Sequence, residues 1–276
     1  MALNSVNTNV GAMIALQNLQ VTNNELSTVQ NRINTGKIVS SAKDNGAIFA
    51  IAQGQRAEIG ALNAVKDSLN RGQSAVDVSL AAGESVSDLL IQLKEKALAA
   101  TDTSLSTSAR SALNEDFTSI RDQIATVVEN ASFNGVNLLD GSSTAGFKAL
   151  ANVAGSTITI NDEDMSLSGS IVTLTAAEAI STSTLATAAL AKVDASIANV
   201  SASLARLGTG SKSLGTHLNF VGKLQDSLEA GVGNLVDADL AKESARLQAL
   251  QTKQQLGVQA LSIANSSTSI LLGLFR

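Results

Sequence analysis

The sequence predicts a mainly α-helical protein, built as a long antiparallel, coiled-coil-like helical rod with a small β-hairpin region. The first observation is a stripe of residues between 190 and 235 that alternate at steps of three and four, and only Ser211 and Gln225 in it are not apolar. This spacing places a narrow seam along one side of a helix. The second observation is that similar stripes recur elsewhere in the chain. The third is the absence of proline, which permits long uninterrupted helices.

The stripe over residues 190–235 predicts a single long helix. At about 1.5 Å per residue it would span roughly 70 Å, so other parts of the chain or other copies must cover its seam. The stripe consists of Leu190, Val193, Ile197, Val200, Leu204, Leu207, Ser211, Leu214, Leu218, Val221, Gln225, Leu228, Val232 and Leu235.

Composition excludes several classes of function. The 276 residues contain no cysteine, so there is no disulfide framework, thiolate metal site or thiol nucleophile. Aromatic residues make up 2% and the net charge is −5, which argues against a nucleic-acid partner. No apolar run is long enough to span a membrane. The first basic residue is Arg32, so we expect either retention in the cytoplasm or export without a cleavable signal.

The amino-terminal segment, up to about Asn34, predicts a helix with an uncharged, amide-rich face. Only Glu25 is charged before Arg32. We expect other copies to bury such a face, because amide groups are then satisfied by hydrogen bonds. Its stripe comprises Ala12, Ala15, Leu19, Thr22, Leu26, Val29 and Ile33.

The next segments predict two further helices. A break over residues 35–47 precedes a helix from about Ile48 to Ala100, whose seam advances by seven residues at a time. Residues 101–108 form a polar turn, and a third helix ends near Asn130. Three long seams favour a bundle of antiparallel helices.

Residues 135–184 differ in kind, because Gly, Ser and Thr punctuate them. Residues 157–160 alternate as a strand does, and residues 161–164 predict a turn that returns to Met165 and Leu167 in a second strand. The density of Ser and Thr from 166 to 187 predicts an exposed tip.

The carboxyl-terminal segment, residues 237–276, carries two apolar stripes, so this helix needs two neighbours. One stripe contains Leu240, Leu247, Leu250, Gly257, Leu261 and Ala264, and the other contains Leu256, Ala260, Ile263, Ile270 and Leu274.

No arrangement of residues predicts catalysis. The run over residues 208–213 lacks the order of a phosphate loop and lies inside the helical seam. His217 is the only histidine, so no histidine pair can hold a metal. Asp162, Glu163 and Asp164 are better explained as a solvated turn than as a cation site. We therefore expect no enzymatic activity, no metal and no cofactor.

Several motifs closely resemble those of bacterial flagellins. The carboxyl-terminal motifs cover residues 234–251, 259–265 and 274–276, and the amino-terminal ones cover 31–36 and 41–47. Residues 133–141 are also similar. The likeness covers the chain apart from residues 142–187, a gap too short for the large outer domains of the family. The resemblance therefore implies a short flagellin.

By this resemblance, residues 1–40 and 234–276 pair as the innermost coiled coil of a filament. Residues 41–233 form the rod, with the β-hairpin insert at about 135–184. The implied function is a structural subunit that polymerises into the extracellular flagellar filament for swimming. The polymerisation interface is expected at Leu19, Leu26, Val29, Ile33, Leu247, Leu250, Leu256, Leu261, Ile263, Ile270, Leu274 and Phe275.

The resemblance also implies partners. These are further copies of the chain, related flagellins, an export chaperone, and the hook-associated and cap proteins, with secretion through the flagellar type III apparatus. An innate-immune receptor grips many flagellins at a Leu-Gln-Arg-Val-Arg-Glu-Leu run. The aligned positions here include Gln92, Lys94 and Glu95, so both arginines are replaced.

Two alternatives remain open at this stage. A hook–filament junction protein shares the end motifs more loosely. The alternative from a different class is a cytoplasmic coiled-coil adaptor or a helical-bundle enzyme, and an adaptor would stay a small soluble oligomer instead of polymerising on seeds.

Overall fold

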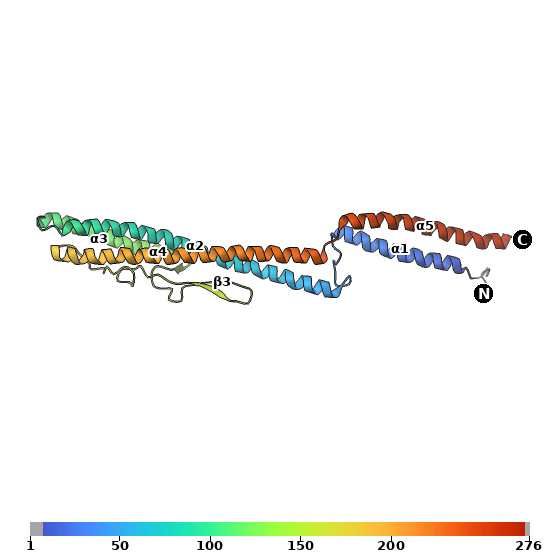
Figure 1. Ribbon diagram of the computed structural model, residues 1–276, viewed down its shortest axis with the longest axis horizontal. Helices are drawn as coiled ribbons and strands as arrows, with labels where there is room; N and C mark the ends of the chain where they lie inside the picture. The colour runs from blue at the N-terminus through green and yellow to red at the C-terminus, as the bar shows by residue number, and fades with distance from the viewer. Residues whose placement is uncertain (1–7, 274–276) are drawn as a thin grey trace. The chain divides into compact units, whose positions relative to one another are not determined.

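The computed structural model describes the backbone of residues 8–273 and side chains as far as residue 266. Five helices lie in this part of the chain: α1 (Val10–Thr35), α2 (Gly46–Ala100), α3 (Thr107–Asn130), α4 (Ser183–Val236) and α5 (Leu240–Gly273). Four short strands lie between α3 and α4: β1 (Ser132–Phe133), β2 (Val136–Asn137), β3 (Phe147–Leu150) and β4 (Thr157–Ile160) (Figure 1). The predicted fold class, mainly helical with a small β region, is confirmed.

Local sequence explains where the helices begin and end. The side chain of Asn9 accepts a hydrogen bond from the Ala12 backbone N–H at 2.9 Å and so caps the start of α1. Gly36 ends that helix in the left-handed conformation, with φ of 68°. Asp239 accepts a hydrogen bond from the Ala241 N–H at 3.0 Å before α5. The ends of these helices therefore follow from capping residues that stand next to the apolar stripes.

The chain forms two compact units. The first, called unit 1, contains Met1–Ala57 and Ser227–Arg276, and the second, unit 2, contains Glu58–Asp226. The division of the chain falls within the sequences of α2 and α4, whereas the boundaries that we expected at residues 40 and 234 follow the breaks between helices.

Unit 2 is built around α2, α3 and α4. Helices α2 and α4 run antiparallel, because Lys94 pairs with Asp194 at 2.8 Å while Asn63 accepts a hydrogen bond from Gln225 at 2.9 Å. Helix α3 folds back along α2, and Lys96 reaches Asp116 across them at 2.8 Å. The side chains of the core are fully buried and come from all three helices, among them Leu69, Leu90, Leu93, Phe117, Ile124, Leu207 and Leu214.

The strand pairing differs from our expectation. Strand β4 pairs with β3, with Phe147 opposite Ile160, and not with Met165 and Leu167. The turn into β3 is specific to glycine, because a Cβ on Gly146 would lie 2.1 Å from the Ile160 carbonyl oxygen and φ there is 63°. The prediction that residues 165–167 form the partner strand was wrong, since the segment before β4 supplies the partner.

Residues 161–182, which we call the strap, connect β4 to α4 without helix or strand. Met165, Val172, Leu174 and Ile180 in the strap are completely buried. The expected exposed tip at residues 166–187 was therefore wrong for much of its length. Its apolar residues fall between the hydroxyl-bearing ones and pack onto the helices of unit 2.

Candidate self-association surface

Helices α1 and α5 pair antiparallel in unit 1 (Figure 1). At one end the Asn9 amide donates to the Ala264 carbonyl at 2.8 Å, and further along Gln254 donates to Asn23 at 2.7 Å. Helix α5 approaches α1 closely at Gly257, where a Cβ would lie 3.3 Å from Leu19 Cδ1. These contacts place the amino-terminal end of α1 beside the carboxyl-terminal part of α5.

Most of the predicted interface residues lie in the seam between these two helices. Val29 and Leu250 are 1% and 5% exposed. Five others are half-buried: Leu19, Leu26, Ile33, Leu247 and Leu261. Their first contact is therefore with the other helix of the same chain.

The second stripe of α5 remains exposed. Leu256 and Ile263 are 60% and 65% exposed. The side chain of Ile270, and Leu274 and Phe275 altogether, lie outside the described residues. The two stripes of α5 thus differ in exposure, because Leu250 and Leu261 pack against α1 whereas Leu256 and Ile263 remain exposed.

Helix α1 carries a second apolar face that the sequence analysis missed. Val10, Met13, Ile14, Leu16 and Val21 are each 50–63% exposed. They stand between the residues of the predicted seam, so the search for one stripe passed over them. Their apolar character in a segment without charge was the available sign.

Among the hollows on this unit, two have mostly apolar linings. One follows α1, and its lining includes Val10, Met13, Ile14, Leu16, Val21 and Asn24. The other lies between the helices, and its lining includes the small residues Gly11, Ala15, Gly257 and Ala260 together with Leu256.

Charge is confined to one half of the helix pair. Residues 8–24 and 254–266 contain no charged side chain. Nearer the other end Arg32 pairs with Glu243 at 3.2 Å, and Glu243 is 7% exposed. Arg32 Nε and Glu243 Oε2 are buried and lack hydrogen-bond partners among the described residues. The uncharged half is therefore the part suited to contact through apolar and amide groups.

The links into α2 and α5 are joined by backbone hydrogen bonds. The Ile38 N–H donates to the Val236 carbonyl at 2.7 Å, and the Ala238 N–H donates to the Gly36 carbonyl at 2.8 Å. Lys37 and Asp237 form an antiparallel bridge between them. The segment after α1 and the segment after α4 are thus hydrogen-bonded to each other.

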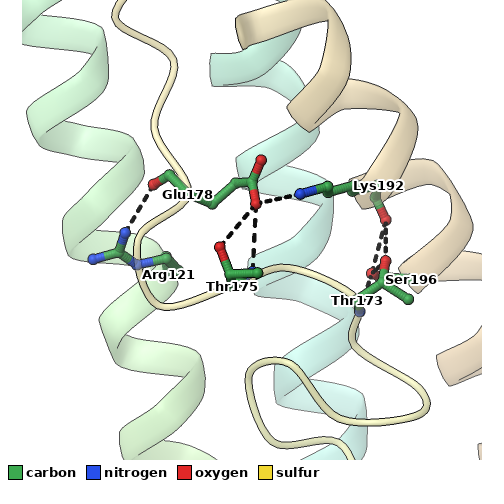
Figure 2. Close-up of polar contacts among 6 residues, drawn as sticks. All are labelled: Arg121, Thr173, Thr175, Glu178, Lys192 and Ser196. Atoms are coloured by element: carbon green, nitrogen blue, oxygen red, sulfur yellow. Dashed lines mark hydrogen bonds and ion pairs between the residues drawn. The ribbon is translucent and has the colours of Figure 1, made fainter.

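In unit 2, Glu178 anchors the strap to two helices. Figure 2 shows its carboxylate beside Lys192 of α4, at 2.6 Å, and its carbonyl accepting a hydrogen bond from Arg121 of α3, at 2.8 Å. Thr175 also donates to the carboxylate, at 3.1 Å. Burial alone would raise the pKa of Glu178, but the hydrogen bonds from Lys192 and Thr175 outweigh it, and the pKa is lowered.

Two further contacts fasten the strap to α4. Glu163, which is 7% exposed, accepts hydrogen bonds from Arg206 Nε at 2.7 Å and from the Ser203 hydroxyl at 2.8 Å. The carboxylate raises the pKa of Arg206. The Ser196 hydroxyl accepts from the Thr173 N–H at 3.1 Å. The buried serines of α4, Ser196 and Ser203, directly precede seam residues in the sequence. The apolar periodicity of the seam therefore did not identify them.

The receptor-aligned residues lie on α2. Gln92 and Glu95 are exposed, whereas Leu93 between them is buried. Lys94 forms its pair with Asp194 with both side chains 48% exposed. Gln92 and Glu95 thus face solvent, whereas Lys94 forms an ion pair with Asp194 of α4.

No group of three or more His, Asp or Glu side chains among the described residues is placed to hold a metal ion. Residues 208–213 are part of α4, so the phosphate-loop interpretation fails for lack of a loop. Among the described helices, none has the length and apolar character needed to cross a bilayer.

Comparison with known proteins identifies relatives over almost the whole chain. A family model for the bacterial flagellin N-terminal helical region matches residues 6–144, and one for the C-terminal helical region matches residues 190–275. Flagellin FljK of Caulobacter vibrioides is 60% identical over 276 residues, which is 100% of both chains. A flagellin of Brucella melitensis is 39% identical over 281 residues, covering 99% of both chains.

A solved structure is similar in fold. The crystal structure of Bacillus cereus flagellin has a TM-score of 0.50 and 22% sequence identity, and the match covers 56% of this chain and 88% of that one.

Proposed function

Because the chain belongs to the bacterial flagellin family and is a structural subunit of the flagellar filament, we propose that its copies associate chiefly through the α1–α5 pair of unit 1. The observation that carries this proposal is the outward apolar surface of the pair. Leu256 and Ile263 on α5, and Met13 on α1, are all at least 60% exposed. Large apolar side chains exposed in number on paired helices mark a site of protein–protein contact.

The interface residues divide into two roles under this proposal. Those of the seam, such as Val29 and Leu250, hold α1 and α5 together as one contact element. Leu256 and Ile263 face a neighbouring subunit. Ile270, Leu274 and Phe275 continue the same stripe in the sequence and extend that contact.

The proposed partners and export route of the subunit are inferred from its family. Copies of this chain and other flagellins are the polymer partners. An export chaperone for the carboxyl-terminal helix, the hook-associated and cap proteins, and secretion through the flagellar type III apparatus to an extracellular filament complete the proposal.

Seeded polymerisation tests the surface. Purified protein is added to sheared filament seeds, and polymer is measured by sedimentation and electron microscopy. Burial of one such side chain is worth about 1.5–3 kcal/mol, so Leu256→Ser with Ile263→Ser should raise the critical concentration on the order of 100-fold or more. Val153→Ser, which changes an exposed aliphatic residue in the β3–β4 turn, is the matched control.

An unchanged critical concentration for the double variant would place the contact elsewhere on the chain. Wild-type protein that remains a small oligomer on seeds would favour an adaptor instead.

We also propose that this flagellin is a weak ligand for the innate-immune receptor of its family. Gln92 and Lys94 stand where that receptor's motif has arginine, and neither reproduces the bidentate contact of a guanidinium. Glu95 keeps its place and is exposed. A second explanation, to which we give equal weight, is that these residues serve contacts between neighbouring subunits.

A further inference from the structure

The β3–β4 hairpin contacts both long helices of unit 2 through one pair of facing residues. Phe147 and Ile160 stand directly opposite each other on the two strands. The ring of Phe147 lies over Gly72 of α2, where an added Cβ would come within 2.8 Å of Cε1. The side chain of Ile160 lies over Gly210 of α4, where an added Cβ would come within 2.9 Å of Cδ1. Each helix therefore offers a seat that any larger residue would fill.

Two hydrogen bonds hold the hairpin at the same level. The Leu150 N–H donates to the Ser68 hydroxyl at 3.0 Å, and Ser68 is 4% exposed. The Ala151 carbonyl can only accept, so Nε2 of His217 is the donor in their hydrogen bond of 2.6 Å. One of these bonds reaches α2 and the other reaches α4, as the two glycine seats do.

The hairpin crosses the helices where their apolar seam is interrupted. Ser211, which follows Gly210, is one of the two seam positions that are not apolar. It accepts a hydrogen bond from Gln73, which follows Gly72. A polar contact inside an apolar seam weakens a helix pair but favours one alignment of its helices. The α4 stretch 208–222 also contains four glycines, and glycine is the least favourable residue inside a helix apart from proline.

A shift of α4 along α2 would destroy the fit at Ile160. Residues four apart lie on the same face of a helix, one above the other. A shift of one turn would therefore replace Gly210 beneath Ile160 with a bulky side chain, either Arg206 or Leu214. Since a single hairpin occupies the seats of both helices, it permits only one alignment of the two.

We propose that the β3–β4 hairpin is a register clamp, which fixes the alignment of α2 and α4 at the interruption of their seam. Phe147 and Ile160 are the contacts of the clamp. Gly72 and Gly210 are positioning residues, because they act through the side chains that they admit. All parts of the clamp belong to unit 2, so this inference is independent of the association proposed for unit 1. It also gives a role to His217, the only histidine of the chain.

Glycine-to-alanine substitutions distinguish a seat from an ordinary helical glycine. Inside a helix alanine is favoured over glycine. Gly60→Ala and Gly222→Ala, where an added Cβ meets open space, should therefore raise the Tm of full-length monomer by about 2–4 °C. Gly72→Ala and Gly210→Ala should instead lower the Tm, because the hairpin loses its seats. Equal gains at all four positions would overturn the inference.

A size-compensating change tests whether the loss arises at the seat. Ile160→Val removes Cδ1, and the next atom of Ile160 lies 3.6 Å from the Cβ added by Gly210→Ala, an ordinary contact distance. Ile160→Val should therefore recover most of the Tm that Gly210→Ala loses, although it costs stability alone. Hydrogen exchange of the Leu150 amide, which reports docking onto Ser68, should rise about tenfold in Gly210→Ala and return toward wild type in the double variant. Additive losses in the double variant would contradict the seating of Ile160.

The alignment itself is measured by pulsed electron spin resonance, since the chain has no native cysteine to label. Spin labels are attached through Arg71→Cys on α2 and Ala198→Cys on α4, both at exposed positions. Arg71 lies near the level of Ser211, and Ala198 lies near that of Asp194, so the labels stand at different levels of the helix pair. Sliding of α4 along α2 therefore changes their separation directly.

The otherwise unchanged labelled protein should give one narrow distribution of distances. Adding Gly72→Ala and Gly210→Ala together should produce a second population displaced by about 5 Å, one helical turn, and Gly210→Ala alone, the milder change, is measured in parallel. A single narrow distribution in these variants, with exchange of the Leu150 amide already raised, would overturn the clamp. The seam alone would then set the alignment of the two helices.

Discussion

Removing the ammonium group that faces Glu178 should loosen the strap of unit 2. In Lys192→Met the carboxylate of Glu178, whose side chain is 10% exposed, keeps its hydrogen bond from Thr175 but loses its cation at 2.6 Å. Leaving one member of a buried pair unpaired costs about 3–5 kcal/mol. Because the Lys192 side chain is 41% exposed, solvent screening reduces the expected loss to about 1–2 kcal/mol.

The loss is measured as thermal unfolding of full-length monomer by circular dichroism. For a unit of this size about 1–2 kcal/mol corresponds to a fall in Tm of about 3–6 °C. Hydrogen exchange of strap amides near Thr173 and Thr175 should rise in the same variant, because their anchor on α4 is weakened. Lys212→Met, which removes an exposed lysine from the same helix, is the matched control.

The pH dependence has a definite sign. The pKa of Glu178 is lowered in the folded protein, so its contribution to stability is complete above the unfolded pKa of about 4.3 and disappears as the pH falls through the folded value. The difference between wild type and Lys192→Met should therefore be present at neutral pH and vanish in strong acid. A Tm for Lys192→Met equal to that of Lys212→Met at neutral pH would refute the anchoring role of this pair.

Three further predictions concern assembly, order and recognition. Deletion of residues 270–276 should leave unit 2 folded but abolish addition to seeds, because it removes the end of the exposed α5 stripe; sedimentation checks this, and a normal critical concentration would contradict it. The α1–α5 pair buries few side chains completely, too few to offset the entropy of ordering both segments. Limited proteolysis of monomer should accordingly cut near Arg32–Lys43 and Lys242–Lys253, and polymer should resist; equal resistance in both forms would exclude the idea. In a receptor reporter-cell assay, the monomer should activate the receptor weakly and Gln92→Arg should restore activation. The reason is that a lost charged contact at an interface hot spot costs about 2 kcal/mol or more. Activation equal to that of an enteric-type flagellin would reject weak recognition.

The local features of this protein were determined by its sequence. The helices follow from the three-and-four spacing of apolar residues and from the absence of proline. Their ends follow from residues such as Asn9 and Gly36, whose effect depends on their immediate neighbours in the chain. The family was also identifiable from the motifs near both ends.

Only the tertiary structure decided which surfaces meet. It paired β4 with β3 instead of residues 165–167, and it laid the strap over unit 2, where Glu178 reaches both Arg121 and Lys192. It also assigned Leu250 to the α1 seam and left Ile263 exposed, although both are apolar residues of one helix. Periodicity shows that a helix has an apolar face, but the partner of that face depends on contacts between residues far apart in the chain, which no local pattern records.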